Sequence, residues 1–196
     1  MAQTTLFDPV LPQGLALQPD FVAPAEEAAL VEWIGTLPLE QARYKAYTAR
    51  RRVLGFGSRF DYDDNRLLPA PPLPEALLPL RDRAAAWAGV EPQALANALV
   101  AEYRPGTPLG WHRDVPDYEL VIGLSLGGPA RMRLRRYPPA PGRKQQVLDL
   151  ELAPRSIYRL QGEARWGWQH GIAPTPGLRW SITLRTLRRD QRGGGR

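Results

Sequence analysis

The chain has 196 residues, of which 43% are hydrophobic and 23% are charged. This is enough for one domain with a buried core and excludes two large domains. No run approaches the roughly 20 apolar residues of a membrane span, so a membrane protein is excluded, and the composition is not that of a disordered chain. The absence of cysteine excludes disulfides, thiolate zinc sites and iron–sulfur clusters, so any metal must be held by histidine and carboxylate. No secretory signal is evident, and we expect a cytoplasmic protein.

Charge is distributed unevenly along the chain. The net charge is +6, yet the first 42 residues contain six acids and no Lys or Arg, so the remainder carries +12. Nearly all of this positive charge is arginine, since Lys45 and Lys144 are the only lysines. The guanidinium group suits bidentate contact with phosphate or carboxylate, so the charge is consistent with a polyanionic partner. A solvated arginine-rich surface without such a partner explains the charge equally well.

The first part of the chain predicts two helices after an extended start. Residues 1–22 are punctuated by proline and glycine, and residues 25–37 space apolar side chains along one face of an amphipathic helix. A second helix is expected within residues 74–89, where Pro79 causes either a kink or a later start.

Between the two helices lies a segment rich in arginine and aromatic residues, residues 44–64. Gly55 and Gly57 are expected to break any regular element there. We therefore expect a flexible, basic and aromatic hairpin.

From residue 97 onward the pattern changes to short strands of period two separated by Gly and Pro turns. Alternating side chains predict strands in four segments: 120–126, 131–135, 147–152 and 179–185. Each is expected to bury one face. This pattern is typical of an antiparallel barrel or jelly roll, so we expect a helix-bearing N-terminal part packed on a C-terminal all-β sandwich.

The chain has only two histidines, and one of them stands in a metal-binding pattern. In Trp111-His112-Arg113-Asp114, positions i and i+2 of a strand point to one face, so the side chains of His112 and Asp114 can converge. With the distant His170, they match the spacing of a facial triad of two histidines and one carboxylate. Such a triad leaves coordination positions open and suits non-haem Fe(II). A lone His-x-Asp is common by chance, so the second histidine carries the argument.

Two arginines on the last predicted strand supply the second half of that argument. Arg179 and Arg185 are six residues apart, so they project from one face, about 20 Å apart on an ideal strand. A keto acid with two carboxylates, chelating the iron, needs a cation at its far end. The alternative is that both arginines are surface residues of a basic tail.

Four motifs taken together resemble the AlkB family of Fe(II)/2-oxoglutarate-dependent dioxygenases: Tyr103-Arg-Pro-Gly106, Trp111-His-Arg-Asp114, Trp168-Gln-His-Gly171 and Arg179-Trp-Ser-Ile-Thr-Leu-Arg185. The resemblance covers residues 40–188 and implies a mostly β (α+β) fold. Its core is a double-stranded β-helix, also called a jelly roll, with an N-terminal, helix-containing nucleotide-recognition lid. The boundaries that follow are residues 1–96 for the extension, helices and lid, 97–190 for the catalytic core and 191–196 for a frayed tail, all in one integrated domain.

The resemblance also implies a cofactor set and roles for individual residues. His112, Asp114 and His170 would ligate Fe(II), while Tyr103, Ser181, Arg179 and Arg185 would bind the cosubstrate 2-oxoglutarate. Within this set Tyr103 would donate a hydrogen bond, Arg179 would pair with the distal carboxylate, and Arg185 would lie near the C1 carboxylate. With O2, the reaction implied is oxidative dealkylation of N-alkylated bases in DNA or RNA, releasing succinate, CO2 and an aldehyde.

The implied partner is nucleic acid carrying alkylated bases, preferably single-stranded, bound by a monomer without membrane contact. The resemblance places Phe56 against the base, with Phe60 and Tyr62 as second choices, because a base taken out of the stack gains about 1–3 kcal/mol by stacking on an aromatic ring. Arg51 and Asp117 complete the expected substrate contacts.

The sequence departs from the family pattern at three positions. Ala101 and Ser181 stand where the family commonly has Asn, and each loses a hydrogen bond worth about 0.5–1.5 kcal/mol. Pro116 replaces an acid that helps to select the base.

Two alternative functions remain. The first is a 2-oxoglutarate-dependent hydroxylase that acts on a protein or small molecule, since a fold does not fix a substrate. The second is a jelly-roll binding module without catalysis.

Overall fold

The structure is a computed structural model that describes residues 11–44, 46–142 and 145–188. Its helices are α1 (Pro24–Gly35), α2 (Leu78–Ala88) and α3 (Gly162–Trp166), with short 3-10 turns η1 (Glu75–Leu77) and η2 (Pro92–Ala94). Its strands are β1 (Leu15–Gln18), β2 (Glu40–Tyr44), β3 (Tyr47–Phe56), β4 (Ser58–Asp61), β5 (Arg66–Pro69), β6 (Asn97–Tyr103), β7 (Leu109–His112), β8 (Tyr118–Gly127), β9 (Ala130–Arg136), β10 (Val147–Leu152), β11 (Ile157–Leu160), β12 (Trp168–Ile172) and β13 (Arg179–Leu187).

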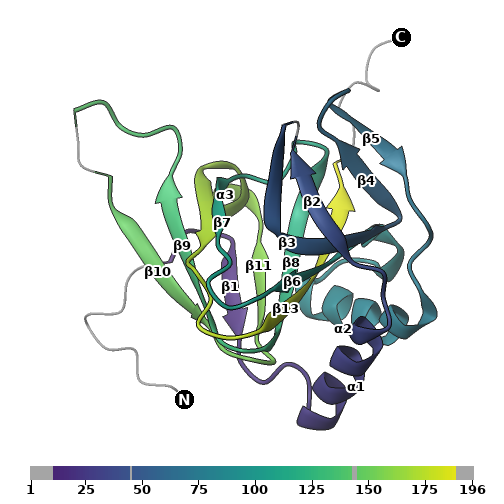
Figure 1. Cartoon of the computed structure of the whole chain (residues 1–196). Coiled ribbons are helices and arrows are strands. Elements are labelled where there is room, and N and C mark those ends of the chain that lie inside the picture. Colours follow the sequence, from purple (N-terminus) through teal and green to yellow (C-terminus); the bar gives the residue numbers. More distant parts are fainter. Residues whose placement is uncertain (1–10, 45, 143–144, 189–196) are drawn as a thin grey trace.

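Two antiparallel sheets build the core (Figure 1). The larger has seven strands in the order β1-β11-β8-β13-β6-β3-β2, and the smaller has four in the order β10-β9-β12-β7. Neighbouring strands are mostly far apart in sequence, as in a jelly roll, where the chain passes repeatedly between the sheets. The expected jelly-roll core is therefore confirmed. Strands β1, β2 and β3 come from the first 96 residues and belong to the larger sheet, so the N-terminal part is built into the core.

Helices α1 and α2 cover one face of the seven-stranded sheet. The predicted stripe of helix α1 buries Leu30 and Ile34 against apolar side chains of β6, β8 and β13. Pro79 lies in the first turn of α2, where its missing N–H is not needed, and η1 precedes it, so a later start is confirmed and there is no kink. Gly89 ends α2 in the left-handed conformation, φ 71°.

The opposite face of the larger sheet looks toward the four-stranded sheet, and a second apolar cluster fills part of the space between them. Met132 and Leu134 of β9, Ile172 of β12 and Leu160 of β11 are buried there. The remainder of this space is lined by polar side chains and holds the candidate site.

Two expectations about the strands are wrong. The predicted strands within β8 and β13 bury both faces, not one, because helices cover one side and the second sheet covers the other; Val121, Ser125 and Ser181 are buried as fully as their apolar neighbours. Residues 44–64 do not form one hairpin. Gly55 lies inside the ten-residue strand β3, which pairs with β2 and β6, and β3 ends just before Gly57, whose φ is +77°. The chain turns again after β4, which pairs with β5.

The acidic N-terminal segment packs against arginines of later parts of the chain. Arg155 pairs with Asp20 at 2.7 Å and with Glu27 at 3.5 Å, and Arg83 pairs with Glu26. The uneven charge distribution therefore serves, in part, to join α1 to the core. Within the described residues, no helix has the length and apolar character needed to cross a membrane.

Candidate metal and cosubstrate site

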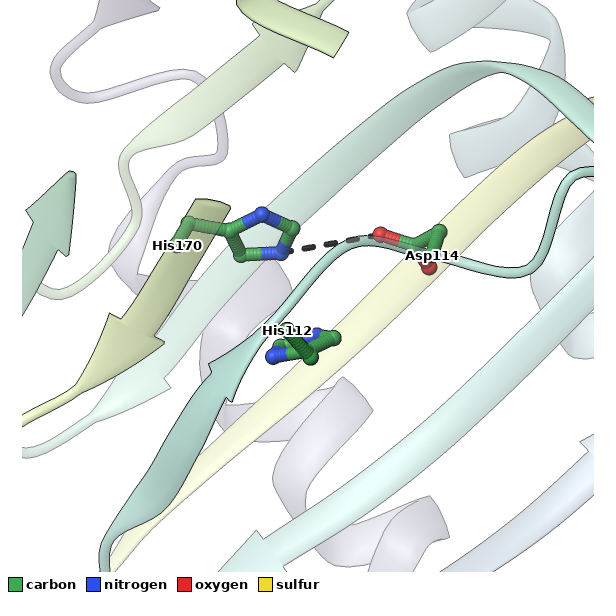
Figure 2. Close-up of side chains that lie close together, drawn as sticks. All are labelled: His112, Asp114 and His170. Carbon is green, nitrogen blue, oxygen red and sulfur yellow. Dashed lines mark ion pairs between the residues drawn. The ribbon is translucent and has the colours of Figure 1, made fainter. Parts of the chain in front are cut away.

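Two neighbouring strands of the smaller sheet bring the histidines together. His112 is the last residue of β7 and pairs directly with His170 of β12. Their imidazole rings lie 4.3 Å apart between centroids (Figure 2). The Nδ1 of His112 donates a hydrogen bond to the Gly110 carbonyl oxygen at 2.9 Å, which leaves Nε2 free to bind a metal.

The third ligand candidate, Asp114, does not lie on a strand, contrary to the reasoning from strand alternation. It follows the end of β7, and its carboxylate faces His170 with Oδ2 3.5 Å from Nε2 (Figure 2). Arg185 of β13 holds it from the other side, since Nε donates to Oδ1 of Asp114 at 2.8 Å. A second bond from Arg185 to the amide oxygen of Asn97, at 3.0 Å, orients the guanidinium group. Arg185 therefore contacts a candidate metal ligand, a role that the sequence analysis did not assign to it.

A buried arginine that sequence reasoning missed anchors the loop after Asp114. Arg165 of α3 is 2% exposed, and one of its terminal nitrogens donates to the backbone oxygens of Asp114 at 3.0 Å, Val115 at 2.8 Å and Tyr118 at 2.8 Å. Burial lowers the pKa of Arg165. This clamp holds the backbone where no strand pairing does. Nothing in the sequence distinguishes Arg165 from the many surface arginines.

The electrostatic environment prepares these side chains for a cation. Burial, then the charge of His112, lowers the pKa of His170 to about 3, and burial also lowers the pKa of His112. Both imidazoles are therefore neutral at pH 7, as metal ligation requires. Burial alone would raise the pKa of Asp114, but Arg185 and the two histidines hold it well below its ordinary range, so the carboxylate is ionised.

The donor set fits a divalent metal with open coordination positions. One ligand atom from each of His112, Asp114 and His170 lies within 4.8 Å of the others. Two imidazoles and one carboxylate on one side of an ion leave the opposite side free for other ligands, which suits non-haem Fe(II).

A second group of polar side chains lies on the inward face of the larger sheet. Arg179 of β13 is 1% exposed, its Nε donates to the Ser125 hydroxyl at 3.0 Å, and its guanidinium lies 4.8 Å from the Tyr103 ring centre. Arg51 of β3 donates to the Tyr103 hydroxyl at 3.4 Å. Burial would raise the pKa of Tyr103, but the two guanidinium groups lower it below its usual value.

This group of guanidinium and hydroxyl side chains fits a carboxylate of an organic ligand. The NH1 atom of Arg179 is buried and has no hydrogen-bond partner in the described part of the chain, and a buried guanidinium nitrogen left in that state is costly unless a ligand satisfies it. Ser181 pairs with Ala101 on one side and Ser125 on the other. Two of the three departures from the family pattern, Ala101 and Ser181, are thus neighbours on adjacent strands, and both place small side chains there.

The residues that were expected to contact the base lie in different parts of the structure. Phe56 is 7% exposed and packs against Trp33 of α1, with ring centres 6.5 Å apart, in the core on the helix side of the larger sheet. This corrects its expected role, because the Phe56 side chain points away from the metal ligands. Arg51, on the opposite face of β3, reaches the Tyr103 hydroxyl and so belongs to the polar group around Arg179.

Phe60 on β4 and Tyr62 just after it contact each other. Their rings meet edge to face, 5.0 Å apart. Burial raises the pKa of Tyr62, and the charges that act on it include those of Arg51, Arg185 and Asp114. Asp117 lies in the loop before β8 and is half-buried, with its backbone oxygen accepting from Arg188.

Comparison with known proteins identifies the class of enzyme that this fold and site define. Residues 14–185 match the model of the 2OG-Fe(II) oxygenase superfamily. The chain belongs to that superfamily and is an Fe(II)- and 2-oxoglutarate-dependent dioxygenase that uses O2.

Individual relatives confirm the resemblance to AlkB. The chain is 32% identical over 183 residues to the "Alkylated DNA repair protein ALKBH8 homolog" of Arabidopsis thaliana. It is 29% identical over 170 residues to "Uncharacterized protein L905" of Acanthamoeba polyphaga mimivirus. It is also 29% identical over 174 residues to a Xenopus tropicalis protein named "tRNA (carboxymethyluridine(34)-5-O)-methyltransferase alkbh8". The solved structure of OsALKBH1 shares the fold, with a TM-score of 0.68, 15% identity and coverage of 91% of this chain and 99% of that one.

The relatives differ in how much of them this chain represents. The matches cover 82%, 81% and 86% of the chain but 73% of the viral protein, 50% of the plant protein and 26% of the frog protein. The methyltransferase activity in the frog protein's name therefore belongs to a protein about four times the matched length and is not transferred to this chain.

Proposed function

We propose that this dioxygenase removes N-linked alkyl groups from bases in nucleic acid. Two observations carry the proposal together: His112, Asp114 and His170 can converge on one ion, and the buried Arg179 has a nitrogen with no partner among the described residues. The charges of both Asp114 and Arg179 act on the buried Tyr158. The substrate class rests on the +12 balance of residues 43–196 and on the nucleic-acid substrates in the names of the plant and frog relatives. Action in the cytoplasm as a monomer is part of the same proposal.

The chain's residues divide the work of binding and orientation. His112, Asp114 and His170 hold Fe(II), while Arg179 pairs with the distal carboxylate of 2-oxoglutarate and the Tyr103 hydroxyl donates to it. Arg185 keeps Asp114 ionised and fixed. Bound Fe(II), with 2-oxoglutarate and O2, would supply the oxidising chemistry, in which one oxygen atom of O2 hydroxylates the alkyl group and the other enters succinate as 2-oxoglutarate loses CO2.

The hydroxylated alkyl group then leaves as an aldehyde, and the base nitrogen recovers its proton. The preceding oxidation of the alkyl group needs a site from which bulk water is partly excluded and a base held against the open side of the metal. Tyr62 and Phe60 are the aromatic residues that would stack on that base, and a base taken from a single strand would reach them at the lowest cost. Asp117 would accept a hydrogen bond from the base.

The experiment compares single-stranded DNA and RNA oligonucleotides with and without an N-methylated base. Formaldehyde released and the unmethylated base formed are measured by mass spectrometry, with Asp114→Ala as the inactive variant. The matched control is Asp82→Ala, which removes an exposed carboxylate on α2. Equal amounts of formaldehyde and restored base, absent with Asp114→Ala, support the proposal. Turnover of 2-oxoglutarate that no oligonucleotide stimulates would instead favour a protein or small-molecule substrate.

A further inference from the structure

The outward side of the four-stranded sheet carries a group of stacked arginine and aromatic side chains. Along β7 and β12, His112 and His170 point inward, so the residues next to them point away from the metal ligands. We name this group the arginine–aromatic face; its members are Trp111, Arg113, Arg133, Arg135, Tyr137 and Gln169. It spans β7, β9 and β12 and the residues that follow β7 and β9 (Figure 1).

Aromatic rings hold the guanidinium groups of this face in place. Arg135 lies 4.4 Å above the centre of the Trp111 ring, and its Nε donates to the side-chain oxygen of Gln169 at 2.8 Å. Arg113 lies 4.1 Å above the Tyr137 ring and donates to the backbone oxygen of Trp166 at 3.0 Å. A stacked guanidinium has lost most of its rotamer freedom already, so it loses less entropy when it binds an anion.

The charges of Arg113 and Arg135 are not paired with a carboxylate in the described part of the chain, whereas those of three nearby arginines are. Arg131 and Arg133 lie 3.5 and 3.7 Å from Asp149, and Arg136 lies 3.1 Å from Glu163. Within residues 11–44, 46–142 and 145–188, neither Arg113 nor Arg135 forms an ion pair; their hydrogen-bond acceptors are a carbonyl and an amide, both neutral.

The position of the face relative to the metal ligands indicates what it meets. Trp111 and Arg113 flank His112, and Gln169 precedes His170. They lie one residue from a candidate metal ligand but on the outer face of the same strands, so the part of a nucleic-acid strand that flanks a target base held at the metal can reach them. A polyanion with planar bases suits alternating guanidinium and aromatic groups, because phosphates bind the former and bases stack on the latter. An acidic peptide offers charge without planar groups.

We propose that the arginine–aromatic face binds the sugar–phosphate backbone of the strand that flanks the target nucleotide, with Arg113 and Arg135 each contacting a phosphate. The inference rests on the proposed nucleic-acid function and adds a second contact surface to it, outside the metal and cosubstrate pocket.

The test measures binding of the full-length protein to a fluorescent single-stranded oligonucleotide of about 16 nucleotides across a range of salt concentrations. The variant is Arg113→Gln/Arg135→Gln. The matched control is Arg81→Gln/Arg83→Gln, which removes the same charge from ion-paired arginines of α2. Each phosphate contact on a single strand contributes about 0.7 to the log–log salt slope, so the variant is expected to lose about 1.4 and the control nothing. Arg135→Lys, which keeps the charge, is expected to keep the slope.

The outcomes separate this inference from the proposed function. If the double variant keeps the salt slope while the unaltered protein still demethylates the oligonucleotide, the arginine–aromatic face does not bind the backbone, and the proposed function is unaffected. If the unaltered protein neither binds nor demethylates any oligonucleotide, both the proposed function and backbone binding by the face are refuted. Tighter binding of polyglutamate than of the oligonucleotide, lost in the double variant, overturns the choice of nucleic acid as the occupant. If the double variant does not fold, the two single variants decide, each expected to lose about 0.7 of the slope.

Discussion

Replacement of Arg165 by methionine tests whether this buried arginine holds the Asp114 loop. Methionine keeps much of the side-chain volume but removes the nitrogen that donates to the oxygens of Asp114, Val115 and Tyr118. One nitrogen carries two hydrogens, so at most two of these bonds are strong, and bonds to a charged donor contribute about 1.5–3 kcal/mol each. Burying the guanidinium costs part of this, since Nε and NH1 of Arg165 have no partner among the described residues. We therefore expect a net loss of about 3 kcal/mol in the free energy of unfolding.

The assay is urea unfolding of the metal-free protein, followed by titration with Fe(II) under anaerobic conditions. Fe(II) affinity is expected to fall by about 10–100-fold, as for other partners that orient a metal ligand. Arg159→Met is the matched control, because Arg159 donates to one backbone oxygen only, that of Ala88, at 3.4 Å. It should lose about 1 kcal/mol or less and keep its Fe(II) affinity. Arg165→Lys should recover part of both losses.

Equal stability losses in Arg165→Met and Arg159→Met would refute the clamp. So would a large stability loss in Arg165→Met with unchanged Fe(II) affinity, because Arg165 would then support the fold without positioning Asp114.

Three further predictions follow from individual contacts. Arg179→Gln should raise the 2-oxoglutarate concentration for half-maximal turnover by about tenfold, because one charge-assisted bond is lost, and should leave Fe(II) affinity unchanged. An unchanged 2-oxoglutarate concentration would show that Arg179 does not bind the cosubstrate. In Gly123→Ala the new Cβ would lie 2.3 Å from the Tyr158 ring. The free energy of unfolding, measured with urea, should therefore fall by about 1–3 kcal/mol. An unchanged free energy of unfolding would show that the ring moves aside freely. Because the pKa of His170 is about 3 in the folded chain and about 6.5 when unfolded, the unfolded state binds the proton first; stability of the metal-free protein should be full above about pH 6.5 and decline as the pH falls toward 3. Unfolding free energies that stay level between pH 7 and 5 would contradict this.

The sequence predicted the jelly roll and the three ligand candidates because both depend on local pattern. Alternation along the strands sets which side chains share a face, and two histidines in the whole chain leave few possible ligand sets. Helices α1 and α2 were predicted for the same reason, since Pro79 and Gly89 mark the start and end of α2, whereas the short helix α3 was not predicted.

What the sequence did not predict depends on contacts between distant segments. Phe56 follows arginines in a way that resembles a base-contacting residue, but the register of β3 against β6 turns its side chain toward α1. Asp114 lies beyond the strand that was expected to orient it, and Arg185 and Arg165 take over that role from positions 71 and 51 residues away. No local pattern marks an arginine as buried, so these roles became visible only in the fold.

The most direct test of the central claim is succinate formation by the anaerobically Fe(II)-loaded protein after addition of 2-oxoglutarate and O2, with and without a methylated single-stranded oligonucleotide. The account predicts succinate that the methylated oligonucleotide stimulates and that Asp114→Ala abolishes. Undiminished succinate with Asp114→Ala would contradict the ligand set, and no succinate from the unaltered protein under either condition would contradict the assignment of the site.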